Sequence, residues 1–209
     1  MLYHSSTADA IDNILDNGFT ELNSWPRNIN FLFSDKKVKY LGNFGIGTYA
    51  FWNNPKLSKF FIKKELRNTS DKHFKTIEFE LKKCIEERGQ KRKVNVLKLC
   101  PNSPDLEYFQ DYVEKYSKNI KRVLNKFEKA NGKSKIKVAG AIIEYFIFYL
   151  KDENGKKIKV DAVCGTSTTN NVFKLDISDG IEYCIRNIKA IDNDSVKLYN
   201  ENEDIERRR

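Results

Sequence analysis

Apolar and polar residues follow two periods along the chain, and each period predicts one kind of element. Apolar positions repeat at helical spacing in the segments 8–17, 55–66, 71–88 and 105–129, and a short apolar run at 136–150 fits a buried helix. Two-residue alternation or short apolar runs predict strands at 2–4, 49–52, 94–99, 156–163, 173–176 and 181–186. Segment 136–150 is also compatible with buried strands, but we favour a helix. Together these elements predict an α+β fold.

Cap and turn residues set the expected helix boundaries. Thr7 is placed to cap the helix over 8–17, and Gly18 is placed to end it. Asn54 and Pro55 form the N-cap and first helical position of the helix over 55–66. In that helix three apolar side chains are expected to face the core: Leu57, Phe60 and Phe61.

A glycine-rich segment precedes the predicted strand at 49–52. It contains Gly42, Gly45 and Gly47. Because glycine lets a backbone take positive φ or approach a ligand closely, the segment predicts a turn that leads into a strand. Taken alone, this pattern is weak evidence for a functional site.

Length and composition bound the class of protein. With 209 residues, 40% of them hydrophobic, the chain is long enough for one domain with a substantial core. We expect a single domain over 1–200, with a helical elaboration around 105–150 and a charged tail over 201–209. The apolar run 138–150 is too short to span a membrane and contains Glu144, which is expected at the surface. Because the N-terminus lacks a signal-peptide pattern, we expect a cytoplasmic protein without membrane contact.

Cysteine and histidine usage argues against a metal site. Cys84, Cys100, Cys164 and Cys184 are widely separated, and the chain has two histidines. This spacing does not match a set of zinc ligands, so we expect no metal cofactor. The thiols are expected to be reduced core residues, with a cysteine nucleophile as the alternative.

An excess of basic residues gives the chain a net charge of +9. Nucleic acid, an acidic protein or an anionic cofactor would each be attracted by this charge. In segment 105–129 cations repeat at helical spacing along one face: Lys115, Lys118, Arg122, Lys126 and Lys129. Such a face is either a solvated surface or a strip that follows a nucleic-acid backbone.

Three short motifs occur in order along the chain. They read LYHSST at 2–7, GIGTY at 45–49 and GIEYCI at 180–185. In this order they resemble the diphtheria-toxin-like and poly(ADP-ribose)-polymerase-like ADP-ribosyltransferases, whose signature is a His, a Tyr and a Glu on three separate strands. The resemblance implies a split mixed β-sheet core with flanking helices and NAD as the co-substrate. It also implies a catalytic site made of His4, Tyr49 and Glu182.

The resemblance gives each of these residues an expected role. Glu182 would stabilise the positive charge that develops on the ribose when its bond to nicotinamide breaks. His4 would hydrogen-bond ribose hydroxyls, and Tyr49 would stack on the nicotinamide ring. Ser5 and Gly47 complete the expected NAD-binding set. Considered singly, each of these residue types would be an ordinary structural residue.

Two positions depart from the family pattern. Ser5 follows the histidine where the family has a glycine, and its side chain can crowd the nicotinamide pocket. Gly180 lies two residues before Glu182, where relatives that modify arginine or guanine usually carry Glu or Gln. Those two acceptors are therefore disfavoured, and the acceptor is left open.

These features lead to the hypothesis of an NAD-dependent mono-ADP-ribosyltransferase that acts as an intracellular toxin or anti-phage effector. The basic segment favours RNA or DNA over protein as the acceptor, and an antitoxin protein is a candidate partner. Three alternatives stay open: a protein acceptor, NAD hydrolysis with water as the acceptor, and a non-enzymatic basic nucleic-acid-binding module.

Overall fold

The computed structural model describes residues 1–21, 29–33, 38, 41–70, 72–132, 135–167 and 180–201. Within them, seven strands form one sheet: β1 (Leu2–Thr7), β4 (Thr48–Trp52), β5 (Phe74–Leu81), β8 (Val96–Leu99), β9 (Ala162–Ser167), β10 (Gly180–Ile185) and β11 (Ile191–Leu198). Their order across the sheet is β11–β5–β1–β4–β10–β9–β8. Neighbouring strands are antiparallel, except for β8 and β9, which are parallel.

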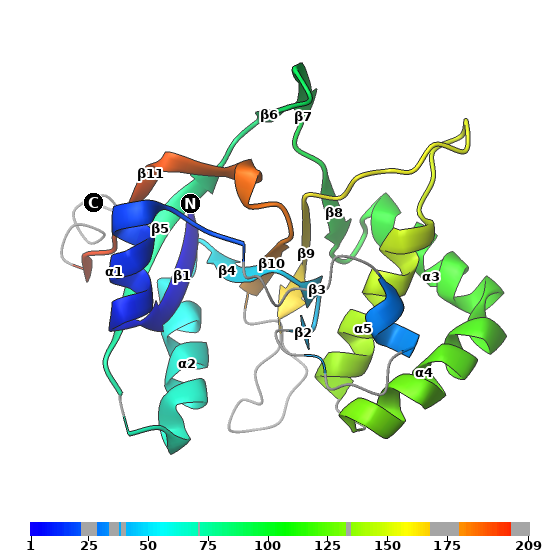
Figure 1. Cartoon of the computed structure of the whole chain (residues 1–209), viewed down its shortest axis with the longest axis horizontal. Helices are drawn as coiled ribbons and strands as arrows, with labels where there is room; N and C mark the ends of the chain where they lie inside the picture. Colours follow the sequence, from blue (N-terminus) through cyan, green and yellow to red (C-terminus); the bar gives the residue numbers. More distant parts are fainter. Residues whose placement is uncertain are drawn as a thin grey trace.

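Helices flank this sheet in two groups (Figure 1). Their bounds are α1 (Ala8–Asn17) and α2 (Pro55–Glu65) in the first group, and α3 (Pro104–Lys115), α4 (Ser117–Asn131) and α5 (Lys135–Tyr149) in the second. Leu2 shares a core cluster with Ile11 of α1, whereas Ser5 contacts Ser58 of α2. Because neighbouring residues of a strand point to opposite faces, α1 and α2 cover opposite faces of β1. The mixed sheet with its helices has the α+β architecture expected from the sequence.

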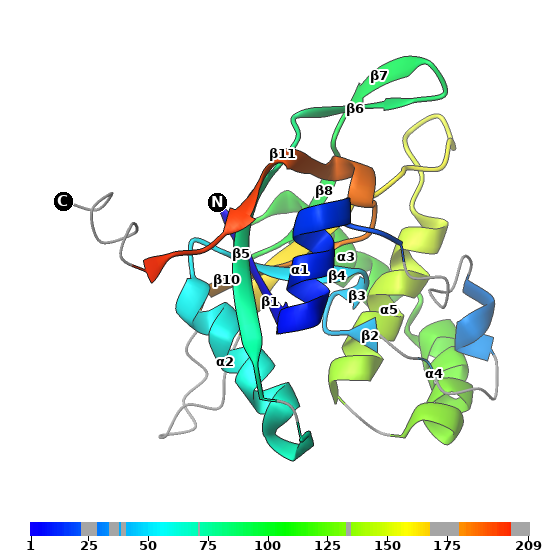
Figure 2. The same cartoon turned by 60° about the vertical axis from the view of Figure 1, so that its left-hand side comes forward.

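Shorter elements complete the described chain. The hairpin of β2 (Leu41–Gly42) and β3 (Gly45–Ile46) contacts α5 (Figure 1). The hairpin of β6 (Cys84–Glu87) and β7 (Gln90–Lys93) projects from the sheet (Figure 2). Short 3-10 turns occur at Ile29–Phe33, Leu66–Asn68 and Ile188–Ala190.

Hydrophobic clusters join the helices to the sheet. One cluster lies between α1 and the sheet and includes Phe79 of β5. A second contains Phe146 of α5 and Val163 of β9, and a third contains Phe127 of α4 and Ile46 of β3. Burial of one such side chain contributes roughly 1.5–3 kcal/mol to folding. The helical elaboration around 105–150 is therefore anchored to the sheet and to the β2–β3 hairpin.

Local signals placed the first two helices correctly. The Asn54 side chain accepts a hydrogen bond from the Leu57 N–H at 3.0 Å, which confirms the expected cap. Gly18 takes φ 74 and its N–H bonds the Ile14 carbonyl oxygen, which confirms the expected end of α1. Thr7 occupies the N-cap position of α1, as expected, but its side chain makes no capping hydrogen bond, and the residue is also the last of β1. Phe60 is also misplaced by the prediction, since it is exposed rather than inward.

The predicted helix over 71–88 is wrong. Residues Phe74–Leu81 form β5, between β1 and β11, and Cys84–Glu87 form β6. Four successive residues of β5 are buried, 76–79, because this strand is covered on both faces. A strand buried on both faces loses its two-residue alternation, and its apolar positions can then match a helical repeat.

The predicted helix over 105–129 is two helices. α3 ends at Lys115 and α4 begins at Ser117, with Tyr116 between them at φ −104 and ψ 16. Hydrogen bonds from the Tyr116 N–H to Tyr112 and from the Ile120 N–H to Tyr116 continue across the break. The apolar repeat is therefore kept through a change of direction, which periodicity cannot detect.

The predicted strand over 156–163 starts later than expected, because β9 covers Ala162–Ser167. Before it, Ile158 and Val160 pack against the cluster around Phe146 without joining the sheet. Their alternation thus reports one-sided packing rather than strand pairing. The strands expected at 94–99 and 181–186 and the helix expected at 136–150 are confirmed, as β8, β10 and α5.

Some expectations fall outside the described part of the chain. The strand expected at 173–176 and residues 202–209 of the expected tail lie there, so those predictions stay untested. Among the described residues, no helix is both long enough and apolar enough to cross a membrane.

Candidate active site

The three motif residues lie on three adjacent strands near the centre of the sheet. His4 is on β1, Tyr49 is on β4 and Glu182 is on β10. Glu182 lies opposite Phe51, and Phe51 lies opposite Tyr3. Directly opposite residues share a face, so regular alternation would place His4 on the face away from Glu182.

A gap between β1 and β4 lets His4 and Glu182 reach the same space in spite of this alternation. The two strands pair at Leu2 and Tyr3 and separate beyond them, whereas β1 pairs with β5 along its whole length. Where the ladder would continue, the His4 ring bonds the Tyr49 backbone instead, with Nδ1 2.7 Å from the carbonyl oxygen. Side chains from both faces can therefore reach the space at the gap.

Two adjoining cavities lie at this gap. The smaller one, of about 230 Å³, is lined by His4, Ser5, Tyr49 and Glu182, among others. The larger one, of about 650 Å³, is lined by His4, Gly47 and Tyr49 together with residues of α1. Small-molecule sites commonly occupy roughly 300–1,000 Å³. The fold thus brings all five residues of the expected NAD site to one pair of cavities.

A hydrogen bond fixes the tautomer of His4, and burial favours its neutral form. Because the Tyr49 carbonyl oxygen can only accept, His4 Nδ1 carries the proton and Nε2 is left as an acceptor. Burial lowers the pKa of His4, and this effect outweighs the opposing hydrogen bond to Tyr49. A neutral imidazole at neutral pH can accept a hydrogen bond from a ligand hydroxyl through Nε2.

The β2–β3 hairpin fixes the position of Tyr49. The Tyr49 hydroxyl donates to the Gly45 carbonyl oxygen at 2.8 Å and accepts from the Phe44 N–H at 3.0 Å. A Cβ at Gly42 would come within 2.5 Å of the Tyr49 ring, so only glycine allows this packing. Burial raises the pKa of Tyr49 well above its usual value, and the hydroxyl stays protonated. The glycine-rich segment therefore holds the aromatic ring that lines both cavities.

Glu182 is a buried carboxyl group without a full set of partners. It is 5% exposed, and its Oε2 has no hydrogen-bond partner among the described residues. Burial raises the pKa of Glu182 from 4.5 to about 7, against the opposing effect of the nearby Ser167 and Asn43 side chains. The Ser167 hydroxyl is likewise buried without a well-aligned partner in the described structure. A ligand hydroxyl at this point would satisfy groups that the protein leaves unpaired.

The structure gives Ser5 and Gly47 local roles as well. Ser5 Oγ lies 2.7 Å from Ser58 Oγ and 2.8 Å from Thr76 Oγ1, so its hydroxyl is held in a buried cluster between β1, β5 and α2. A Cβ at Gly47 would come within 2.5 Å of the Ile185 carbonyl oxygen, and glycine there allows close approach to β10.

Sequence reasoning missed several residues of the site. Asn43 and Ser167 flank Glu182; Asn43 lies in the glycine-rich segment that was predicted as a turn, and Ser167 is the last residue of β9. The expectation that Glu144 is at the surface is wrong. Its carboxylate is buried, accepts a hydrogen bond from the Ile46 N–H at 2.8 Å and forms an ion pair with Arg186. The ion pair links α5 to the end of β10 and to the hairpin that holds Tyr49.

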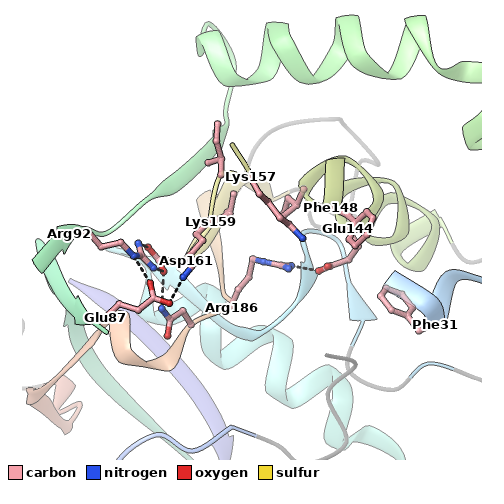
Figure 3. A pocket seen from close by; sticks show the side chains of 13 residues that line it. Phe31, Glu87, Arg92, Glu144, Phe148, Lys157, Lys159, Asp161 and Arg186 are labelled. Carbon is pink, nitrogen blue, oxygen red and sulfur yellow. Dashed lines mark hydrogen bonds and ion pairs between the residues drawn. The ribbon is translucent and has the colours of Figure 1, made fainter. Parts of the chain in front are cut away.

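A separate cavity of about 290 Å³ lies beside the β6–β7 hairpin (Figure 3). Arg92 binds the buried Asp161 through both terminal nitrogens, at 2.7 and 2.8 Å. Hydrogen bonds from Lys159, and then from Arg92, lower the pKa of Glu87 to about 2. The other charged groups drawn there are paired with one another, and Lys157 lies over the Phe148 ring, so we interpret this cavity as a structural junction.

The residues expected to contact nucleic acid lie on α3 and α4. Lys118, Arg122 and Lys126 are exposed on α4, whereas Lys115 is exposed at the end of α3. The break at Tyr116 separates Lys115 from the repeat of the other three. The expectation of one continuous cationic rod is therefore corrected to a shorter strip on α4.

The structure places the cysteines and the side chains that can ligate metals. All four cysteines are free, and Cys164 and Cys184 are buried. Burial raises the pKa of Cys184 to about 12, which disfavours the nucleophilic thiolate. Among the described residues, no group of three or more His, Cys, Asp or Glu side chains is arranged to hold a metal ion.

Comparison of the chain with protein-family models, with curated proteins and with solved structures found no match in any of the three. The function is therefore inferred from the geometry of the chain itself. His4, Tyr49 and Glu182, which lie far apart in sequence, meet at one gap in the sheet.

Proposed function

We propose that this protein is an NAD-dependent ADP-ribosyltransferase whose site is the gap between β1 and β4. The observation that carries the proposal is the convergence of His4, Tyr49 and Glu182 on one cavity from three adjacent strands. The order and identity of these residues are those of the family signature that the sequence resembles. In support of the proposal, Glu182 offers a buried carboxyl oxygen that has no partner in the described part of the chain, and this fits a ribose hydroxyl donor.

NAD would supply the ADP-ribosyl group, with nicotinamide as the leaving group. His4 Nε2 would accept a hydrogen bond from a ribose hydroxyl, and the fixed ring of Tyr49 would provide a flat surface for nicotinamide. The bond between ribose and nicotinamide breaks with its electron pair leaving on nicotinamide. Ionised Glu182 would then stabilise the positive charge on the sugar, where low solvent exposure strengthens the interaction.

The acceptor forms the new bond to the ribose carbon and loses a proton. Glu182, with a pKa of about 7, is suited to take up that proton near neutral pH. We propose nucleic acid as the acceptor class because α4 presents a strip of exposed cations. The toxin or anti-phage role, with an antitoxin as partner, rests on the resemblance alone.

Labelled NAD tests this proposal directly. The protein is incubated with it and with separate pools of RNA, DNA and protein, and both nicotinamide release and label transfer are measured. We expect label in RNA or DNA and a loss of at least about 100-fold in rate for Glu182→Gln, in line with removal of one group that stabilises charge in a transition state. Glu80→Gln, a neutral substitution at an exposed strand position, is the matched control and should keep full activity.

Other outcomes separate the alternatives. Nicotinamide release without label in any pool would indicate NAD hydrolysis, and label confined to protein would indicate a protein acceptor. Absence of nicotinamide release, or a Glu182→Gln variant as active as wild type, would refute the enzymatic proposal. The non-enzymatic binding module would then be the remaining hypothesis.

A further inference from the structure

The helices α3, α4 and α5 border a groove that the proposed chemistry does not use. It has a volume of about 870 Å³ and lies between α3, α4, α5 and the turn that follows α5. Five tyrosines from α3, α5 and the break before α4 line it: Tyr108, Tyr112, Tyr116, Tyr145 and Tyr149. We call this feature the tyrosine groove.

The tyrosine rings form an ordered but exposed surface. Tyr112 and Tyr116 have ring centroids 4.7 Å apart, and Tyr145 and Tyr149 have centroids 4.9 Å apart. Tyr112 is anchored edge-on against the buried ring of Phe146 at 5.0 Å. Tyr108 is 53% exposed and Tyr149 is 46% exposed, so these rings do not serve as core. Contiguous exposed aromatic surface of this kind indicates a binding site.

Cations lie among the rings. The same groove is lined by Lys115, Arg122 and Lys151. Among the described residues, none of these three cations forms an ion pair with a carboxylate. Three acidic residues also line the groove, Asp111, Asp152 and Glu153, and of these Asp152 is engaged by the backbone N–H groups of Asn154 and Lys156. Over its whole length, α4 carries five Lys or Arg residues, Arg122 among them, against one Glu.

Flat rings interleaved with cations match a ligand that offers flat faces and negative charge alternately. A single-stranded nucleic acid does this, because its bases can stack on aromatic rings while its phosphates meet the cations. A duplex hides the faces of its bases inside the stack and would use only the cations. An acidic protein would likewise use the cations but leave most of the exposed rings without matching partners.

We propose that the tyrosine groove binds single-stranded nucleic acid, RNA or DNA, with bases on the exposed tyrosines and phosphates on Lys115, Arg122 and the cations of α4. Binding in the groove does not depend on NAD chemistry. A role for the bound strand as the acceptor rests on the proposed function. The connection between the two sites is α5, where Tyr145 lines the groove and the adjacent Glu144 bonds the hairpin that holds Tyr49.

Fluorescence anisotropy of the full chain tests this site. Labelled single strands of RNA and of DNA, each about ten nucleotides long, are compared with a blunt duplex of the same sequence. The wild type should bind the single strands more tightly than the duplex. The Tyr108→Ala/Tyr149→Ala variant should bind the single strands about 10- to 100-fold more weakly, whereas duplex binding should change little.

Two further variants make the result specific. Tyr108→Phe/Tyr149→Phe should keep the affinity for single strands, because it keeps the stacking surface and loses only the hydroxyls. Phe60→Ala removes an aromatic ring of similar exposure from α2 and should also leave the affinity unchanged. Circular dichroism checks that each variant is folded. Equal single-strand affinity for wild type and the double alanine variant, or no preference of the wild type for single strands, would overturn the proposal.

This test can fail independently of the proposed enzyme. Glu182→Gln should bind single strands as tightly as wild type, because Glu182 lies at the gap in the sheet and not in the tyrosine groove. Single-strand binding without NAD cleavage would support the groove and refute the proposed enzyme. NAD cleavage together with unchanged single-strand binding in the double alanine variant would support the enzyme and refute the groove.

Discussion

At the scale of single residues, Glu182 occupies an environment that weakens the fold when its carboxyl group is ionised. The group is buried, one of its oxygens has no hydrogen-bond partner among the described residues, and burial raises its pKa to about 7. A raised pKa means that the folded state favours the protonated form, so ionisation weakens the fold. Such an environment is costly for a structural residue, but it is what an acid–base group near neutral pH requires.

This environment predicts a pH-dependent gain of stability for Glu182→Gln. Between pH 4.5 and 7 the folded wild type binds more protons than the unfolded chain, so its stability falls as pH rises through this window. The shift from 4.5 to about 7 corresponds to a penalty of about 3 kcal/mol above pH 7. Urea unfolding of both proteins from pH 4 to pH 8 should show the free energy of unfolding of Glu182→Gln rising relative to wild type by about that amount.

Glu80→Gln provides the control for this measurement, because Glu80 is an exposed carboxylate on β5. Its difference from wild type should stay nearly constant over the same pH range. A constant difference for Glu182→Gln as well would show that its carboxyl group is not perturbed by burial.

At the scale of elements, α5 and the β2–β3 hairpin act as one unit. A Cβ at Gly140 of α5 would overlap the carbonyl oxygen of Gly42, and Glu144, one turn later, bonds the Ile46 N–H. Because Gly42 in turn packs on the Tyr49 ring, the position of α5 is transmitted to the site. The helical elaboration therefore supports the site, apart from any binding role of its own.

Gly140→Ala should consequently be destabilising although alanine is the better helix former. The gain in helix propensity, about 1 kcal/mol, is opposed by a backbone overlap that forces α5 away from the hairpin, and overpacking of this kind costs about 1–3 kcal/mol. We expect a lower midpoint of urea unfolding and, for the proposed enzyme, a lower kcat/KM because Tyr49 is displaced. Asn125→Ala, at an exposed position of α4, is the matched helix control and should be neutral or slightly stabilising. A Gly140→Ala variant as stable as this control would contradict the packing argument.

At the scale of the whole molecule, the net charge of +9 is concentrated in part on α4, which carries five Lys or Arg residues and one Glu. A basic surface attracts any polyanion, so charge alone does not distinguish single strands from duplexes. The tyrosine groove and the α4 strip should thus contribute differently to binding, one through stacking and the other through release of counterions.

Salt dependence separates these contributions. In Lys118→Ala/Lys126→Ala the slope of log affinity against log salt concentration for single strands should become shallower by about 1.4, because each phosphate contact on a single strand contributes about 0.7. Tyr108→Ala/Tyr149→Ala should lower the affinity without changing that slope. Lys82→Ala/Lys83→Ala removes the same charge from exposed positions after β5 and should change neither. A slope that responds equally to both lysine pairs would show that the binding is unspecific.

Features with local causes could be predicted from the amino-acid sequence alone. The cap of α2 at Asn54 and Pro55 and the end of α1 at Gly18 depend on contacts between near neighbours, so their signals are readable in the chain. The helix at 136–150 was favoured from an apolar run that also allowed strands, and the structure confirms it as α5. The three motif residues were proposed from their order along the chain.

Features that depend on pairing between distant residues became visible in the folded chain. The tertiary structure buried β5 on both faces, joined Glu144 to Arg186, opened the gap that lets His4 and Glu182 share a cavity, and brought tyrosines of α3 and α5 into one groove. Each of these results from contacts between residues far apart in the chain. Such contacts leave no local periodicity, because burial and pairing are properties of the assembled sheet and its helices.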